Sequence, residues 1–283
     1  LYYGGHYTFT NVTIQNNAGD GIYAQYIGDL TLTNSTLTNN AGYGYFDNNS
    51  NNSLALQNVN LTNNGVAGRL SVNTAMNNVD WTGNGRNEIE WSGGTLQQDA
   101  AWNRLPAGIT TYHVVGDITV ADGVSLTVGA GVNVIFSQYT GLFVNGQITA
   151  VGTPTDSITF TAAVSNTSGY WDFVQIGGGS VLTDSDSSQI SYALLEGGGY
   201  STYNPTLYIY RSSPTLDHIT IRNSGGEGLY AYYYYNDQKG FSLDTAVIEN
   251  NGEQGMYLYY GGHYTFTNVT IQNNAGDGIY AQY

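Results

Sequence analysis

Few residues of this chain have the chemistry of a metal site. The sequence contains no cysteine, which excludes thiol chemistry and Cys-type zinc sites. Asp184 and Asp186 have the D-x-D spacing of calcium loops, but the other ligands of such a loop are missing from the sequence around them. Glu227, Glu253 and Asp20 precede a glycine that recurs in successive units, so a cation could also bridge these carboxylates. We predict no cofactor and no metal, with Ca²⁺ at these acidic residues as the alternative.

The residues that could act in acid–base catalysis each have a structural explanation. His6 belongs to a repeated segment, His113 begins an expected strand, and His218 falls in a column of asparagines. No expected coil combines Arg or Lys with several Asp, although a site for uronate sugars would need cationic groups. Arg222 and Glu249 share a column, which predicts an ion pair between adjacent coils. We predict that the protein is not an enzyme.

Internal repeats define the elements that must position these residues. Residues 1–26 return without one change as residues 258–283, an offset of 258 − 1 = 257. Self-similarity at a fixed period indicates a repeat architecture. A shorter unit lies inside this period, because the asparagine pair that begins at Asn16 returns at Asn39 and again at Asn63. Each unit of about 23 residues suits one coil of a solenoid.

Asparagine pairs recur once per unit, after short stretches of alternating apolar residues that would place their side chains on one face of a strand. An inward asparagine at a turn can donate its side-chain amide to the turn of the next coil. The pairs, or one member of each, therefore predict an amide ladder, which we interpret as structural because every unit repeats it. They are Asn16 and Asn17, Asn39 and Asn40, Asn63 and Asn64, Asn250 and Asn251, and Asn273 and Asn274.

A glycine, a residue expected to point inward and an outward aromatic residue follow the pairs that begin at Asn16, Asn39 and Asn250. Aromatic pairs on adjacent strands stabilise a solenoid by roughly 0.2–1 kcal/mol each, and this is the interpretation that we favour. Lateral contact between copies comes second, and stacking on sugar rings third. The candidate residues for these contacts are Tyr23, Phe46, Tyr230, Tyr232, Tyr257 and Tyr259.

The abundance of Thr, Val, Ile and Tyr among turn residues predicts an all-β chain with almost no helix. Units of the form N-V-T-I-x-N-N-x-G-x-G-I-Y resemble the repeat of right-handed parallel β-helix proteins, and residues 116–195 look like the opening coils of secreted bacterial β-helix surface proteins. The resemblance implies a single-stranded, right-handed parallel β-helix, a β-solenoid with coils of about 23 residues. That family contains polysaccharide lyases, phage tailspikes and surface proteins, so it does not fix the function.

Residues 93–112 break the repeat pattern, and we interpret residues 95–112 as a junction between modules. Residues 1–94 are then the C-terminal coils of one module, and residues 113–283 are the N-terminal and middle coils of the next, in one continuous solenoid. Both ends of the sequence lie in coil sequence without a capping pattern. We therefore expect a parent chain built as a tandem array of modules that repeat at the offset of 257.

The net charge of −15, with 21 acidic against six basic residues, disfavours nucleic acid as a partner. No apolar run is long enough to insert into a membrane. We expect a structural protein at the cell surface that forms an extracellular filament, with further copies of itself as partners, end to end and side by side. The alternatives are a glycan-binding adhesin shaft and a polysaccharide-degrading β-helix enzyme. The aromatic residues favour the adhesin between these two.

Overall fold

The computed structural model describes residues 1–48, 53–165, 167–181, 184–201, 203–235 and 237–282. Across these residues there are 28 strands and two short 3₁₀ helices, η1 (Pro106–Gly108) and η2 (Asp184–Ser187). The prediction of an all-β chain with almost no helix is therefore confirmed. No helix in the described part of the chain is long and apolar enough to cross a membrane.

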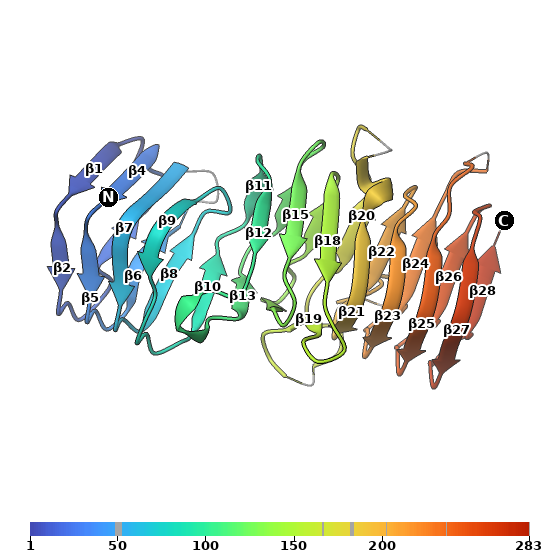
Figure 1. Cartoon of the computed structure of the whole chain (residues 1–283). Coiled ribbons are helices and arrows are strands. Elements are labelled where there is room, and N and C mark those ends of the chain that lie inside the picture. Colours follow the sequence, from blue (N-terminus) through green and yellow to red (C-terminus); the bar gives the residue numbers. More distant parts are fainter. Residues whose placement is uncertain (49–52, 166, 182–183, 202, 236, 283) are drawn as a thin grey trace. The chain divides into compact units, whose positions relative to one another are not determined.

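The strands build a parallel β-solenoid of about 24 residues per turn, which confirms the predicted fold class with a turn slightly longer than expected. Each strand pairs with the strand one coil away, so that successive coils lie side by side within each part of the chain (Figure 1). The chain divides into two compact units. The first holds Leu1–Thr95 and Arg104–Gly116, and the second holds Leu96–Asn103 and Asp117–Tyr283.

The first unit has three runs of paired strands. Phe9 faces Leu32 and Leu32 faces Leu56 in the strand register, so one core column passes through three successive coils. Its strands are β1 (His6–Thr10), β2 (Thr13–Gln15), β3 (Ile22–Ala24), β4 (Asp29–Thr33), β5 (Thr36–Thr38), β6 (Tyr43–Asp47), β7 (Ser53–Thr62), β8 (Val66–Leu70), β9 (Ala75–Asp80), β10 (Glu88–Trp91) and β13 (Thr111–Val114); β11 (Gly94–Leu96) crosses the division.

The second unit continues the same architecture, and its coils vary more in length. The step from Ser224 to Asn251 is 27 residues, and Leu216 faces Leu243 across the same step. Leu243 faces Phe266 across a shorter one. The strands of this unit are β12 (Ala100–Trp102), β14 (Ile118–Val120), β15 (Ser125–Val128), β16 (Asn133–Phe136), β17 (Leu142–Val144), β18 (Gln147–Val151), β19 (Ile158–Ala162), β20 (Val174–Gly177), β21 (Gln189–Glu196), β22 (Leu207–Tyr210), β23 (Thr215–Arg222), β24 (Leu229–Tyr232), β25 (Ser242–Glu249), β26 (Met256–Tyr259), β27 (Thr265–Gln272) and β28 (Ile279–Gln282).

Inward side chains stack in columns along the core of each unit. Leu32 and Leu56 are almost fully buried in the first unit, as are Leu216 and Leu243 in the second. Each such burial contributes about 1.5–3 kcal/mol relative to an exposed side chain. The alternation that buries these residues also turns their neighbours outward, so every coil presents a row of side chains to the surface.

Left-handed backbone bends divide the coils at a constant place. Asn34, Asn58 and Asn78 have φ of 49°, 54° and 51°, a conformation that asparagine tolerates better than most residues. The equivalent residues in the second unit include His218 and Thr245, with φ of 49° and 47°. The histidine in the asparagine column therefore lies at a backbone bend.

Candidate functional site

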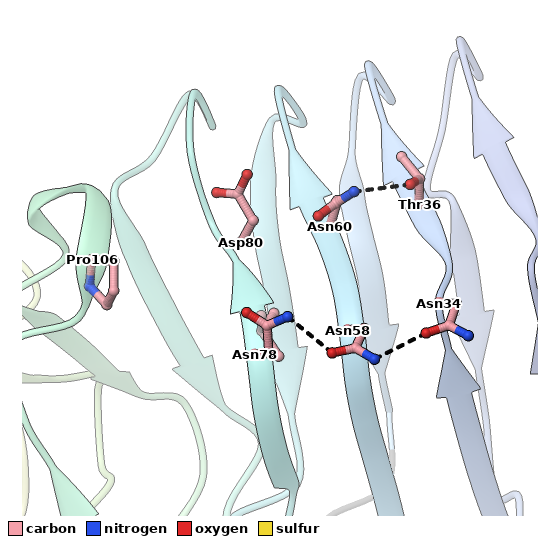
Figure 2. Close-up of a pocket in the computed structure, with 8 residues that line it drawn as sticks. Asn34, Thr36, Asn58, Asn60, Asn78, Asp80 and Pro106 are labelled. Carbon is pink, nitrogen blue, oxygen red and sulfur yellow. Dashed lines mark hydrogen bonds between the residues drawn. The ribbon is translucent and has the colours of Figure 1, made fainter.

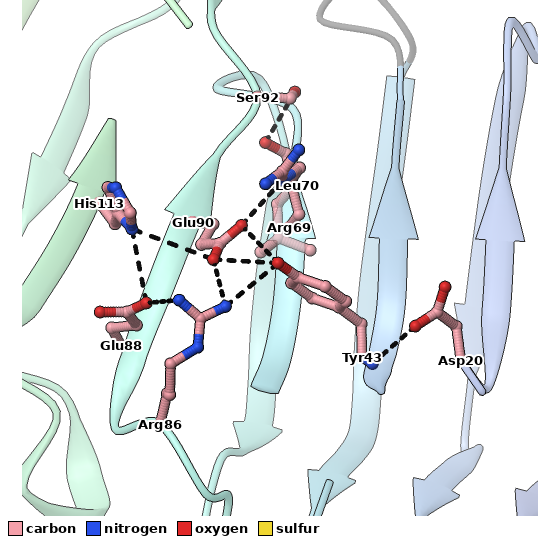
Figure 3. Close-up of polar contacts among 9 residues, drawn as sticks. All are labelled: Asp20, Tyr43, Arg69, Leu70, Arg86, Glu88, Glu90, Ser92 and His113. Atoms are coloured by element: carbon pink, nitrogen blue, oxygen red, sulfur yellow. Dashed lines mark hydrogen bonds and ion pairs between the residues drawn. The ribbon is translucent and has the colours of Figure 1, made fainter. Parts of the chain in front are cut away.

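Polar side chains from neighbouring coils of the first unit form a cluster on its outer face, which we call the ionic cluster (Figure 3). Glu88 and Glu90 lie on β10 on either side of the buried Ile89, so strand alternation turns both carboxylates outward. The cluster consists of Tyr43, Arg69, Arg86, Glu88, Glu90 and His113.

Glu90 is the centre of the ionic cluster. Its Oε2 accepts hydrogen bonds from Arg69 Nε at 2.8 Å and from the Tyr43 hydroxyl at 3.0 Å. Its Oε1 accepts one from Arg86 Nη2 at 2.5 Å. These contacts leave the Glu90 side chain only 2% exposed although it projects from the outer face. Buried carboxylates of this kind require paired cations because an unpaired buried charge is costly.

Glu88 and His113 complete the cluster at its other side. Arg86 Nη1 donates to Glu88 Oε1 at 2.7 Å, so one guanidinium bridges both glutamates. His113 Nδ1 lies 3.5 Å from Glu88 Oε1 and 3.9 Å from Glu90 Oε1. Burial alone would raise the pKa of Glu88, but the hydrogen bond from His113 and the charge of Arg86 outweigh it and lower that pKa. Burial raises the pKa of Tyr43, and the Glu90 carboxylate raises it further.

The ionic cluster continues an aromatic row. Tyr23 faces Phe46, Phe46 faces Arg69, Arg69 faces Glu90, and Glu90 faces His113 in the strand register. Tyr23 and Phe46 stack with ring centroids 5.2 Å apart, and the Arg69 guanidinium lies 4.7 Å from the Phe46 centroid. Such a cation over a ring face is worth about 0.5–1 kcal/mol at an exposed site. Two of the six basic residues of the chain are placed in this cluster.

In the described asparagine pairs, the side-chain amide bonds between coils come from the second member. Asn17 Nδ2 donates to Asn40 Oδ1 at 2.8 Å, and Asn40 Nδ2 donates to Asn64 Oδ1 at 2.9 Å. Asn251 Nδ2 donates in the same way to Asn274 Oδ1 at 2.8 Å. The first members are instead left-handed backbone positions; they are Asn16, Asn39, Asn63, Asn250 and Asn273, with φ from 55° to 59°.

Two tyrosine rows lie on the outer face of β22, β24 and β26. In one row, Tyr208, Tyr230 and Tyr257 stack with centroids 5.2 and 4.7 Å apart. In the other, Tyr232 has Tyr210 on one side and Tyr259 on the other, each at 5.3 Å. The interplanar angles of these four pairs, 8° to 24°, show that the rings cover one another's faces.

This stacking limits what the tyrosine rows can bind. A sugar stacks on an aromatic ring through the ring face, but Tyr230 and Tyr232 each have a neighbouring ring stacked on both sides. The tyrosines of both rows are partly exposed. Burial raises the pKa of Tyr208 and of Tyr230, and the neighbouring tyrosines raise it further, so both phenols stay neutral at physiological pH. The rows thus present uncharged hydroxyl groups.

A polar groove of about 520 Å³ lies over β5, β7 and β9 of the first unit (Figure 2). An amide chain runs along it, in which Asn78 Nδ2 donates to Asn58 Oδ1 at 2.9 Å and Asn58 Nδ2 donates to Asn34 Oδ1 at 3.0 Å. Asn60 donates to Thr36 beside this chain at 3.1 Å. The lining is uncharged apart from Asp80, which suits a neutral polar ligand.

The aspartates of the D-x-D motif bind different partners. Asp184 accepts a hydrogen bond from the backbone N–H of Gly123 at 2.7 Å. Asp186 accepts two bonds of 2.7 Å from Lys239 Nζ. In the described residues of this loop the two carboxylates therefore face separate groups, and Ca²⁺ at the pair stays a prediction.

The predicted ion pair of Arg222 has a different partner in the structure. Arg222 faces Glu249 in the register as expected, but its Nε donates to Glu196 Oε1 at 3.0 Å on the opposite neighbouring coil. Glu249 accepts a hydrogen bond from Gln272 instead, at 2.8 Å. The column was predicted correctly and the partner wrongly, because a residue in a solenoid has an equivalent neighbour on each side.

Comparison with known proteins supports the fold of the second unit. Residues 172–283 match the family model described as right handed beta helix region. No curated protein and no solved structure matches the chain.

Proposed function

We propose that the chain is a structural module of an extracellular filament. The proposal starts from the match of residues 172–283 to the right-handed β-helix family. In this filament, modules of one long polypeptide, repeating at the offset of 258 − 1 = 257, follow one another as a continuous solenoid. The observation that carries the proposal is the way in which the two identical copies of the repeated coil pair with their neighbours.

The two copies use opposite edges of the same coil. Phe9 and Phe266 are one repeat position, because 266 − 257 = 9. In the first copy Phe9 pairs with Leu32 of the following coil, and in the second copy Phe266 pairs with Leu243 of the preceding coil. One coil sequence can therefore accept a neighbour on both edges, with the same residue in the same core column.

The asparagine ladder can also form bonds to the coil on either side. Asn17 and Asn274 are also one repeat position, since 274 − 257 = 17. Asn17 donates forward to Asn40, whereas Asn274 accepts from Asn251 behind it. A single asparagine in a continuous array would make both bonds at once. Identical modules would then join without any change in the ladder.

Continuity sets a length that can be measured. One period, at about 24 residues per turn, contains about 11 turns. At about 4.8 Å per turn, each module would advance the filament by about 50 Å. The row that ends at Tyr280 would continue through its copy Tyr23 into Phe46 and the ionic cluster.

Chains of one, two and three modules test this proposal by electron microscopy. The expected result is a straight rod whose length rises by about 50 Å per added module. Rods that stay constant in length, or beads joined by flexible linkers, would contradict it. In native material, a denatured band near 30.5 kDa would defeat the tandem array, whereas a far larger polypeptide yielding the same peptides would support it.

The polar groove supports a second candidate, a glycan-binding shaft. Amide and hydroxyl groups such as those of Asn58, Asn60 and Thr36 are hydrogen-bonding partners that suit a neutral sugar. A glycan array comparing the unaltered chain with Asn58→Ala tests this function. Binding that Asn58→Ala leaves unchanged would place the glycan elsewhere, and turnover in a reducing-sugar assay would favour an enzyme instead.

A further inference from the structure

The ionic cluster contains three ligand atoms at metal-site spacing. Glu88 Oε1 and Glu90 Oε1 lie 3.5 and 3.9 Å from His113 Nδ1, and one ligand atom from each residue can be chosen so that all lie within 4.8 Å of one another. An ion bound tetrahedrally at about 2.0–2.1 Å holds its ligand atoms about 3.3–3.4 Å apart. The two measured sides of the triangle therefore need to shorten by about 0.1–0.2 Å and about 0.5–0.6 Å.

We propose that Glu88, Glu90 and His113 form a binding site for a divalent transition ion of the Zn²⁺ class. We further propose that the Arg86 guanidinium is the internal cation that fills this place when no metal is bound. Its two terminal nitrogens lie 2.7 Å from Glu88 Oε1 and 2.5 Å from Glu90 Oε1, the same two oxygens that face His113. Metal and guanidinium would thus compete for one pair of carboxylate oxygens.

The surroundings permit this exchange. The Arg86 side chain is 47% exposed, so it can turn into solvent, whereas the Glu90 side chain is only 2% exposed and stays in place. Arg69 Nε holds Glu90 Oε2, and the Tyr43 hydroxyl lies 3.1 and 3.0 Å from Oε1 and Oε2, so the carboxylate is fixed with Oε1 facing His113 Nδ1 at 3.9 Å. Groups that orient a ligand in this way raise metal affinity.

The donor set selects the class of metal. One imidazole nitrogen and two carboxylate oxygens suit Zn²⁺, Ni²⁺ or Cu²⁺, which accept mixed nitrogen and oxygen ligands in low coordination numbers. Ca²⁺ prefers six to eight oxygen ligands, which this cluster does not provide. Once Arg86 leaves, Arg69 stays on Glu90 and His113 Nδ1 still faces both carboxylates. With a neutral imidazole, the two carboxylates and Arg69 keep a net negative charge that attracts a divalent cation.

Zn²⁺ titration of the full chain by isothermal calorimetry tests the proposal with variants that should change the Zn²⁺ affinity in opposite directions. His113→Ala and Glu90→Gln are expected to weaken Zn²⁺ binding at least tenfold because each removes a ligand. Arg86→Gln is expected to tighten binding by about tenfold because it removes the competing cation. Lys239→Gln is the matched control, since it also removes a cation from a carboxylate partner, but in the second unit.

The sign of the Arg86→Gln effect separates a metal site from a purely structural ion-pair network. Absence of saturable Zn²⁺ binding, equal or weaker binding by Arg86→Gln, or undiminished binding by His113→Ala would each overturn the proposal, as would a preference for Ca²⁺. X-ray absorption at the zinc edge needs no variant and keeps the test valid if a substitution impairs folding. One imidazole among the zinc ligands is expected, and a spectrum with oxygen ligands alone would refute the site.

Discussion

Replacement of Asn64 by alanine should be far more destabilising than replacement of its neighbour Asn63 by glycine. Asn64 Oδ1 accepts bonds from the backbone N–H and the side-chain amide of Asn40, at 3.0 and 2.9 Å, and its Nδ2 donates to the Leu37 carbonyl at 2.9 Å. Three lost hydrogen bonds contribute about 1 kcal/mol each. Asn40 is also buried, so its orphaned N–H groups add a desolvation penalty. The expected loss of unfolding free energy is about 3–5 kcal/mol.

The control isolates the amide ladder from the backbone bend. Asn63 is exposed and has φ of 55°, a conformation that glycine adopts without strain. Asn63→Gly should therefore change the unfolding free energy by less than about 1 kcal/mol. Urea denaturation followed by circular dichroism measures both variants, and hydrogen exchange at the Asn40 amide reports local opening. Equal losses for the two variants would refute the assignment of the ladder to the second member of each pair.

Three further outcomes follow from the backbone and the titrating groups. Thr245 has φ of 47°, which costs a β-branched residue about 1 kcal/mol, so Thr245→Asn should raise the urea midpoint, and a lower midpoint would contradict this reasoning. Burial and then the charge of Asp117 raise the pKa of Asp172 from 3.8 to about 6. The folded state therefore holds a proton that the unfolded chain has lost between these values. The resulting penalty is present above the folded pKa and disappears as the pH falls toward 4. Because Asp172 is partly exposed, we expect solvent screening to leave a pH-dependent change of about 1 kcal/mol in the unfolding free energy. Urea curves measured at a pH above the folded pKa and at a pH near 4 should show this difference in the unaltered chain, and Asp172→Asn should abolish it. In an alkaline titration followed by tyrosinate absorbance, Tyr208 and Tyr230 should ionise above the ordinary pKa of 10. Tyr208→Phe should remove part of this late ionisation, which would assign it to Tyr208. An unchanged titration curve would contradict the stacked row.

The sequence predicted the columns of the solenoid because the coil length hardly varies where the pattern is clear. Steps of 23 and 24 residues keep each asparagine pair at one place of the coil, so the register of Asn17, Asn40 and Asn64 follows from counting. The sequence did not reveal which member of a pair turns inward. That choice depends on the left-handed conformation of the preceding residue, for example Asn39 with φ of 55°, which spacing alone does not specify.

The ionic cluster was missed for a physical reason. Its column changes residue type at every coil, from Phe46 to Arg69 to Glu90, and the last step, from Arg69 to Glu90, is shortened to 21 residues. A search for a repeated residue type finds nothing in such a column. The visible signal was Glu88 and Glu90, two carboxylates on either side of one residue of a short strand.

Two kinds of recurring geometry explain where a solenoid of this type can acquire new chemistry. At the bend, the backbone is left-handed in successive coils, but the residue is Asn58 in one coil, His218 in another and Thr245 in a third. The backbone path is thus kept more strictly than the residue type. Inward positions are fixed by core packing and by the amide ladder, whereas an outward position needs only to tolerate its neighbours on the adjacent coils. Glu90 and His113 occupy such outward positions, and strand pairing brings them together without any constraint from the core. Pairing of parallel coils therefore brings outward side chains of adjacent coils into contact. A binding site is best sought where the residue type changes along such an outward column.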